Sequence, residues 1–284
     1  CYDKAIAIDP NVAVVWSNKG WALTNQGKYS EAIECIDKAI ELDPNLAVAW
    51  GNKGWAFTNQ GKYSEAIECI DKAIELDPNL AVAWTNKAAA LSYMGKYSEA
   101  IECIDKAIAL DPNLAIAWNN KGYLFIYQGK YSEALEALNK AIELDPNLVL
   151  AWNNKGYLLQ EKGKYSEALE CYDKAITLDP NNKNAWYNKT YLLMYQGKYS
   201  EALEALNKVM ELDPNLAVAW ILKGSIFYRE RKYPEALEAL DKAIELDPNN
   251  AEAWFGKGTI LKILGRNTEA QKCFDKANEL GHIE

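Results

Sequence analysis

A tryptophan recurs every 34 residues along the whole chain, and this spacing constrains the fold more than any other feature. The series consists of Trp16, Trp50, Trp84, Trp118, Trp152, Trp186, Trp220 and Trp254. An Asp-Pro-Asn sequence closes each interval with the same step. A fixed period of this length indicates one supersecondary unit repeated in tandem, because neighbouring copies can then bury each other's apolar faces.

Each 34-residue interval predicts two helices. In residues 47–57 the apolar residues recur at steps of three or four, which places them on one face of a helix. Gly61 suits a left-handed residue that ends this helix. Ser64 is predicted to cap a second helix through its hydroxyl, and Pro78, which lacks an amide hydrogen, ends the unit. The interval therefore predicts a helix–turn–helix with about three turns in each helix.

The motif within the interval resembles the tetratricopeptide repeat, whose pattern runs Trp, Leu-Gly, Tyr, Ala, Phe and Pro at the same period. The matching residues of the second interval are Trp50, Gly54, Phe57, Ala66, Ile70 and Pro78. A Lys replaces the Leu of the pattern in every interval, and its stem can cover apolar surface while its amine stays in water. The resemblance implies an all-α, right-handed superhelical solenoid of antiparallel helix pairs, with the first helices on the inner side.

The resemblance covers residues 13–284, which are predicted to form a single solenoid of eight repeats. The predicted repeats are 13–46, 47–80, 81–114, 115–148, 149–182, 183–216, 217–250 and 251–284. Residues 1–12 align with the end of a second helix, so they are predicted to be the truncated second helix of a preceding repeat. The apolar side of this helix would lack its partner, which makes it a candidate surface for head-to-tail self-association.

The charge of the chain disfavours nucleic acid as a partner, and its apolar pattern disfavours a membrane. The formal net charge is −9, and acidic residues concentrate on the predicted second helices. No stripe of Lys and Arg is available to neutralise phosphates, so nucleic acid is not an expected partner. No segment is long and apolar enough to span a bilayer. The partner is therefore predicted to be a protein or peptide.

Six cysteines occupy one equivalent position in the predicted second helices. Packed helices lie about 8–10 Å apart, whereas a disulfide requires Cα atoms within about 7 Å. Equivalent cysteines are therefore not expected to bridge, and they are interpreted as small packing residues in a reducing compartment, which predicts a cytoplasmic protein. The six residues are Cys1, Cys35, Cys69, Cys103, Cys171 and Cys273.

The sequence predicts no enzymatic activity, no metal site and no cofactor. His282 is the only histidine, so histidine acid–base catalysis has no support. The cysteines lack the short Cys-x-x-Cys spacing of metal sites, and the recurring Gly-Lys pairs lack the spacing of a phosphate-binding loop. A catalytic domain elsewhere in a longer parent protein stays open.

A second stripe of side chains on the predicted first helices is the candidate binding surface. Its asparagines, two residues after the Trp, offer a donor and an acceptor to a peptide backbone, and its aromatic residues offer apolar contact at low entropic cost. The arrangement is similar to family members that hold an extended peptide on an inner asparagine ladder. The candidate residues are Asn18, Asn52, Asn86, Asn120, Asn154 and Asn188, with Trp21, Trp55, Tyr123, Tyr157 and Tyr191 five after the Trp and Tyr93, Tyr127 and Tyr195 nine after it.

Two interpretations of this stripe and three of the function stay open. Neighbouring first helices could cover the stripe, with each Asn capping a backbone group. If the stripe is accessible, the chain is predicted to be a protein–protein interaction scaffold that binds an extended peptide or a helix in its concave groove. The alternatives are a structural element that stacks end to end and a regulatory or substrate-recruiting arm of a larger enzyme.

Overall fold

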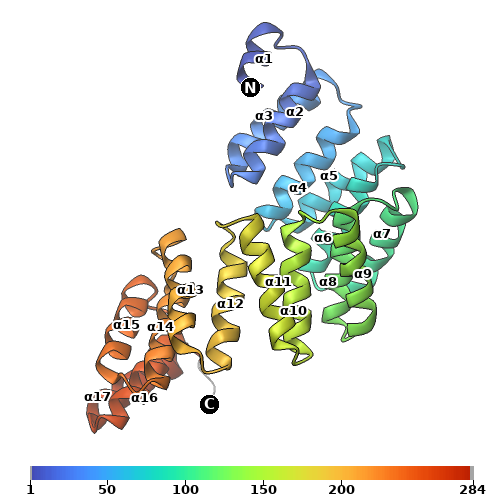
Figure 1. Cartoon of the computed structure of the whole chain (residues 1–284). Coiled ribbons are helices and arrows are strands. Elements are labelled where there is room, and N and C mark those ends of the chain that lie inside the picture. Colours follow the sequence, from blue (N-terminus) through green and yellow to red (C-terminus); the bar gives the residue numbers. More distant parts are fainter. Residues whose placement is uncertain (1, 282–284) are drawn as a thin grey trace. The chain divides into compact units, whose positions relative to one another are not determined.

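The computed structural model describes residues 2–281, and within that range its regular secondary structure is entirely α-helical (Figure 1). A short helix, α1 (Tyr2–Ile8), precedes a series of helix pairs. The pairs are α2 (Ala13–Asn25) and α3 (Tyr29–Leu42), α4 (Ala47–Asn59) and α5 (Tyr63–Leu76), α6 (Ala81–Tyr93) and α7 (Tyr97–Leu110), α8 (Ala115–Tyr127) and α9 (Tyr131–Leu144), α10 (Val149–Glu161) and α11 (Tyr165–Leu178), α12 (Lys183–Tyr195) and α13 (Tyr199–Leu212), α14 (Ala217–Arg229) and α15 (Tyr233–Leu246), and α16 (Ala251–Ile263) and α17 (Asn267–Glu279). The all-α prediction is confirmed.

The chain divides into two compact units, Cys1–Leu158 and Leu159–Glu284, with the boundary inside α10. Within a unit, the second helix of a pair packs against its own first helix and against the next first helix, as α5 packs against α4 and α6. Successive first helices also contact each other directly, as α4 does with α2 and α6, and α14 with α16. The paired helices therefore pack in tandem in each unit, whereas the single solenoid over residues 13–284 stays a prediction.

A glycine on each of several first helices lets the two helices of the pair approach closely. In α4, a Cβ added at Gly54 would lie only 2.9 Å from the carbonyl oxygen of Ala66 on α5. Ala66, Ile70 and Ala73 of α5 are fully buried against α4 and α6. The apolar faces predicted from the spacing of three and four are therefore the faces that form the core.

The first helix of the second pair ends as predicted, but the second helix begins differently. Gly61 has a φ of +79°, and the amide of Lys62 donates a 2.9 Å hydrogen bond to the carbonyl oxygen of Phe57, which is the left-handed glycine ending. The next helix begins at Tyr63, and its N-cap Lys62 makes no side-chain cap hydrogen bond. The cap predicted at Ser64 is wrong, because Ser64 lies inside the first helical turn.

The repeated tryptophan holds its helix to the preceding turn. Each indole donates its Nε1–H to the carbonyl oxygen of the proline six residues earlier. The distance is 2.9 Å at Trp118 and Pro112, and 3.5 Å at Trp220 and Pro214. The same bond forms at Trp16, Trp50, Trp84, Trp152, Trp186 and Trp254. This contact explains why the Trp and the Asp-Pro-Asn sequence recur with one period.

The lysine that departs from the family pattern forms an ion pair between repeats. Lys53 Nζ lies 2.6 Å from Asp37 Oδ1 on α3 and 5.8 Å from the centre of the Trp50 ring. The amine was expected to be in water, but it is bound by the carboxylate of the preceding repeat. Equivalent pairs are Lys19–Asp3, Lys87–Asp71, Lys121–Asp105, Lys189–Asp173 and Lys257–Asp241.

The described cysteines pack in the core, as predicted. Cys35, Cys69, Cys103, Cys171 and Cys273 are buried and form no disulfide, and Cys1 lies outside the described residues. Burial raises the pKa of the thiols of Cys35, Cys69, Cys103 and Cys273. No helix in the described range combines the length and the apolar character that crossing a membrane requires.

Candidate functional site

The asparagines of the predicted ladder all lie on first helices and are all partly buried. They are Asn18 on α2, Asn52 on α4, Asn86 on α6, Asn120 on α8, Asn154 on α10 and Asn188 on α12. Each follows the Trp of its repeat by two residues. Because Trp faces the core side and Asn is displaced by about 200° around the helix, the Asn lies towards the side where successive first helices meet.

Asn52 and Asn154 each join two successive first helices. The Nδ2 group of Asn52 donates a 3.0 Å hydrogen bond to Oγ of Ser17 on α2. The Nδ2 group of Asn154 donates a 2.9 Å hydrogen bond to Oδ1 of Asn119 on α8. Each acceptor directly follows the Trp of the preceding repeat. The structural interpretation therefore holds for these two residues, although the partner is a side chain rather than the backbone group that was expected.

Whether another asparagine of the first unit has a partner depends on the residue that follows the Trp of the preceding repeat. Asn86 would need an acceptor on the residue after Trp50, but that residue is Gly51. Among the described residues, Asn86 and Asn18 make no side-chain hydrogen bond. Asn120 accepts a 3.1 Å hydrogen bond from Nδ2 of Asn119 through its Oδ1, so its own amide group keeps two donors.

The aromatic residues five positions after the Trp differ in exposure. Trp55 and Tyr123 are half-buried, whereas Trp21, Tyr157 and Tyr191 are exposed. Tyr123 donates a 3.0 Å hydrogen bond to the hydroxyl of Tyr127, one turn later on α8. Burial and this hydrogen bond together raise the pKa of the Tyr123 phenol. Tyr123 is therefore a neutral, fixed aromatic group at neutral pH.

The tyrosines nine positions after the Trp are the most exposed aromatic residues of the stripe. Tyr93, Tyr127 and Tyr195 expose 63%, 55% and 67% of their surface. Each contacts the tyrosine that begins the second helix of the preceding repeat. Tyr93 stacks on Tyr63 with ring centres 5.4 Å apart, and Tyr127 stacks on Tyr97 at 5.7 Å.

The supporting tyrosines of these pairs were not predicted from the sequence. Tyr195 contacts Tyr165 edge to face, with ring centres 5.3 Å apart. In each pair the two tyrosines are separated by 30 residues, so this constant offset is the signal that could have found them. The supported rings are held in place before any ligand arrives, which lowers the entropic cost of using them for binding.

The stripe of the first unit is uncharged on α2, α4, α6 and α8. The positions two before and two, five and nine after each Trp carry only aliphatic, amide and aromatic residues there. The result is a neutral surface on a chain with a net charge of −9. Such a surface can bind backbone amides and apolar side chains, but it offers no charged group for general acid–base chemistry or for metal binding. Within the described residues, no cluster of His, Cys, Asp and Glu suits a metal ion.

Comparison with known families gives consistent matches along the chain. The family model described as tetratricopeptide repeat matches residues 13–46, 47–80, 81–114, 115–148 and 149–182. Further models of the same repeat match residues 171–204, 224–265 and 251–280. No curated protein sequence matches the chain.

Several solved structures have a similar fold. A chain of the APC/C hetero-tetramer Cut9–Hcn1 aligns with 92% of this chain at a TM-score of 0.80 and 21% identity, and the alignment spans 51% of that chain, so this chain covers about half of its length. PilF of Pseudomonas aeruginosa gives a TM-score of 0.62 and 23% identity over 73% of this chain and 94% of its own. YrrB, described as having an unusual peptide-binding site, gives a TM-score of 0.50 and 29% identity over 66% of this chain and 96% of its own.

Proposed function

The chain belongs to the tetratricopeptide repeat family and is a protein-interaction scaffold, and we propose that its first helices bind an extended peptide of a partner protein. One observation carries the proposal. On one side of α2, α4, α6 and α8, the first unit combines the side-chain amides of Asn18 and Asn86, which have no partner among the described residues, with the stacked Tyr93 and Tyr127 and with an absence of charge. These groups match the two features that every extended peptide offers, which are backbone amides and alternate side chains.

The asparagines have different parts in this proposal. Asn18 and Asn86 offer both the donor and the acceptor of their side-chain amides to a peptide backbone. Asn52 and Asn154 use one donor to hold neighbouring repeats, which leaves a carbonyl oxygen that can accept from a peptide N–H. Asn120 and, on the second unit, Asn188 complete the proposed set. Asn52 and Asn154 thus have a structural role beside the proposed binding role, whereas Asn18 and Asn86 have the binding role alone.

The aromatic residues supply the apolar part of the proposed contact. Tyr93 and Tyr127 are exposed by more than half, yet stacking on Tyr63 and Tyr97 fixes their rings. Buried tyrosine rings contribute strongly to protein interfaces because few rotatable bonds are frozen on binding. Trp21, Trp55 and Tyr157 extend this surface on the first unit, and Tyr191 and Tyr195 offer the same kind of contact on the second unit.

The test compares variants that separate the two roles of the asparagines. A peptide array identifies a bound sequence, and fluorescence polarisation then measures its affinity for the full chain. Asn86→Ala should weaken binding by up to about tenfold, since a hydrogen bond contributes roughly 0.5–1.5 kcal/mol. Tyr93→Ala and Tyr127→Ala should weaken it at least as much, and added salt should have little effect because the surface is neutral.

The matched control is Asn139→Ala, which changes an exposed asparagine on α9, outside the proposed surface. It should leave the affinity unchanged. Asn52→Ala should lower the stability of the chain as well as the affinity, because it breaks the bond to Ser17. If Asn86→Ala, Tyr93→Ala and Tyr127→Ala all stay folded and bind as tightly as the parent, the proposed surface is not the binding site.

A second candidate function is head-to-tail self-association. In α1 no residue is buried, and Tyr2 and Ile8 expose 38% and 86% of their surface. An apolar helix face of this kind can bind a second copy. Light scattering over a concentration series tests this candidate, and a constant monomer mass would remove it. The cytoplasmic location and the role as an arm of a larger enzyme remain predictions.

A further inference from the structure

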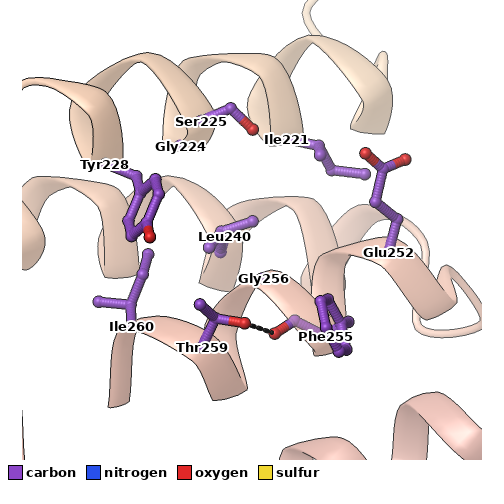
Figure 2. A pocket seen from close by; sticks show the side chains of 10 residues that line it. All are labelled: Ile221, Gly224, Ser225, Tyr228, Leu240, Glu252, Phe255, Gly256, Thr259 and Ile260. Atoms are coloured by element: carbon purple, nitrogen blue, oxygen red, sulfur yellow. Dashed lines mark hydrogen bonds between the residues drawn. The ribbon is translucent and has the colours of Figure 1, made fainter. Parts of the chain in front are cut away.

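The first-helix stripe changes character near the end of the second unit. Leu222 and Gly256 stand where earlier repeats have the ladder asparagine, and Glu252 stands where most have an aliphatic residue. Glu252 and Gly256 line a cavity of about 200 Å³ bounded by α14, α15 and α16 (Figure 2), whereas Leu222 lines an adjoining cavity. The cavity is smaller than the roughly 300–1,000 Å³ of sites for drug-sized ligands, so its size suits a single side chain.

Small residues create the cavity and apolar residues line it. Gly256 contributes no side chain, and Ser225 stands where α8 carries the aromatic Tyr123. At Gly224 the space is filled instead by Leu240, which would lie 2.9 Å from an added Cβ. Leu240 and Ile260 are almost fully buried and form apolar walls. The cavity is therefore adapted to an aliphatic group.

Aromatic rings form the ends of the cavity. Figure 2 shows Tyr228 and Phe255 at opposite ends, with Leu240 between them. Phe255 is supported by Phe274 of α17, with ring centres 5.5 Å apart. A rigid wall of this kind favours a defined side-chain shape over a range of shapes.

At the cavity, the Glu252 carboxylate is the charged group that a ligand can pair with. The Thr259 hydroxyl donates a 3.0 Å hydrogen bond to the carbonyl oxygen of Phe255 and is therefore satisfied. The exposed Glu252 carboxylate forms no ion pair with any described residue. Glu252 also lines an adjoining cavity of about 400 Å³, together with Tyr187 and Arg229. Besides burial, its negative charge raises the pKa of Tyr187, so the carboxylate acts on both cavities.

We propose that this cavity binds an aliphatic side chain of a partner peptide, and that the adjacent residue of that peptide is a lysine or arginine paired with Glu252. The aliphatic group fills the space beside Ser225 and Gly256, where it replaces water on an apolar surface. The basic group meets a carboxylate that has no partner. Arg229 lines the adjoining cavity together with Glu252 and repels a cation there, so the basic residue approaches Glu252 from the smaller cavity.

The site goes beyond the neutral peptide surface of the first unit, because it lies on other helices and selects by charge. The probes are capped hexapeptides that differ only in a central pair, Leu-Lys, Leu-Gln, Leu-Glu or Ala-Lys. Their binding to the full chain is measured by the change in fluorescence polarisation. Leu-Lys should bind most tightly, and added salt should weaken it towards the affinity of Leu-Gln, since exposed ion pairs are screened.

Two variants separate the charge from the cavity. Glu252→Gln should weaken Leu-Lys about threefold, as expected for an exposed ion pair, and should leave Leu-Gln unchanged. Gly256→Val should weaken both peptides, because its side chain enters the cavity while its Cβ meets Leu240 at an acceptable 3.4 Å. The control Glu238→Gln removes an exposed charge from α15, away from the cavity, and should change neither affinity.

Several results would overturn the proposal. The first is that Leu-Lys and Leu-Glu bind with equal affinity. The second is that Glu252→Gln, or a folded Gly256→Val, binds Leu-Lys as tightly as the parent chain does. The third is that no probe binds detectably. The peptide selected for the first unit is measured in parallel, and both cavity variants should leave its affinity unchanged. Failure at one surface is thus distinguished from failure at the other.

Discussion

Lys53 Nζ and Asp37 Oδ1 lie 2.6 Å apart, although the two residues belong to consecutive repeats. The lysine side chain exposes 20% of its surface and the aspartate 46%, so the pair is partly shielded from solvent. The amine also lies near the face of the Trp50 ring, where a cation is attracted by the aromatic quadrupole. One lysine therefore links two repeats and covers the tryptophan of its own.

Two repeats lack this ion pair and provide a direct test. Lys155 lies 5.7 Å from the centre of the Trp152 ring, as in the paired repeats, but the equivalent of the aspartate is Asn139. Asn139→Asp should complete the pair and raise the free energy of unfolding by about 0.2–1 kcal/mol. The gain, measured by urea unfolding, should shrink at high salt.

The reverse change is Asp105→Asn, which removes the partner of Lys121. It should lower the free energy of unfolding by a similar amount. Glu102→Gln removes the same charge from an exposed site on α7 and should have a smaller effect. If Asp105→Asn and Glu102→Gln shift the urea midpoint equally, the contribution comes from net charge and not from the pair.

Arg231 has a φ of +62°, in the turn position that Gly197 occupies with a φ of +74° in the preceding repeat. The left-handed conformation costs a residue with a Cβ roughly 1–2 kcal/mol, and glycine avoids this cost but loses more entropy on folding. Arg231→Gly should therefore stabilise the second unit by about 1 kcal/mol in thermal or urea unfolding. Arg231→Ala removes the charge and keeps the strain, so an equal gain from both variants would contradict this explanation.

The tryptophan hydrogen bonds predict a graded effect of replacement by phenylalanine. Trp118→Phe removes a 2.9 Å bond to Pro112, whereas Trp220→Phe removes a bond of 3.5 Å to Pro214. A normal hydrogen bond contributes about 0.5–1.5 kcal/mol, and one at 3.5 Å contributes less. Trp118→Phe should therefore destabilise the chain more than Trp220→Phe does, and equal losses would assign the effect to packing alone.

Tyr123 should make stability depend on alkaline pH. Burial, with the hydrogen bond to Tyr127, raises its folded pKa above the ordinary value of about 10. The contribution to stability is therefore complete below pH about 10 and is lost as the pH rises through the folded pKa. Subtracting the tyrosinate absorbance titration of Tyr123→Phe from that of the parent isolates this phenol. Tyr127→Phe should lower its pKa, and an unchanged titration would contradict the assigned hydrogen bond.

The helices were predictable because the 34-residue period and the apolar spacing act locally. The role of the lysines was not, because it requires knowing that the residue three after a Trp faces a position 16 residues earlier. The recurrence of Asp at that position in some repeats, and of Asn139 and Asn207 in others, was the available signal. Ser64 was misassigned because the helix begins at Tyr63, before the hydroxyl can act as a cap.

For the candidate site, the sequence predicted where the side chains lie but not which of them bond to each other. The sequence placed the asparagines and tyrosines on one side of the first helices, but it could not separate Asn52, which bonds Ser17, from Asn86, whose counterpart is Gly51. That difference depends on which side chains meet between repeats. The cavity near Gly256 could not be predicted from the sequence either, because its shape depends on how three helices pack and not on any single residue.

The tryptophan bonds also bear on how the chain folds and how it could change length. A Trp bonds a proline six residues away, a lysine pairs 16 residues away, tyrosines stack 30 apart and Asn52 bonds a serine 35 apart. All of these separations are short, which gives low contact order and favours rapid, local folding. Removing or duplicating one 34-residue block preserves all of these separations, so the repeats that remain still meet at equivalent positions, and the residues at those positions decide which bonds form again.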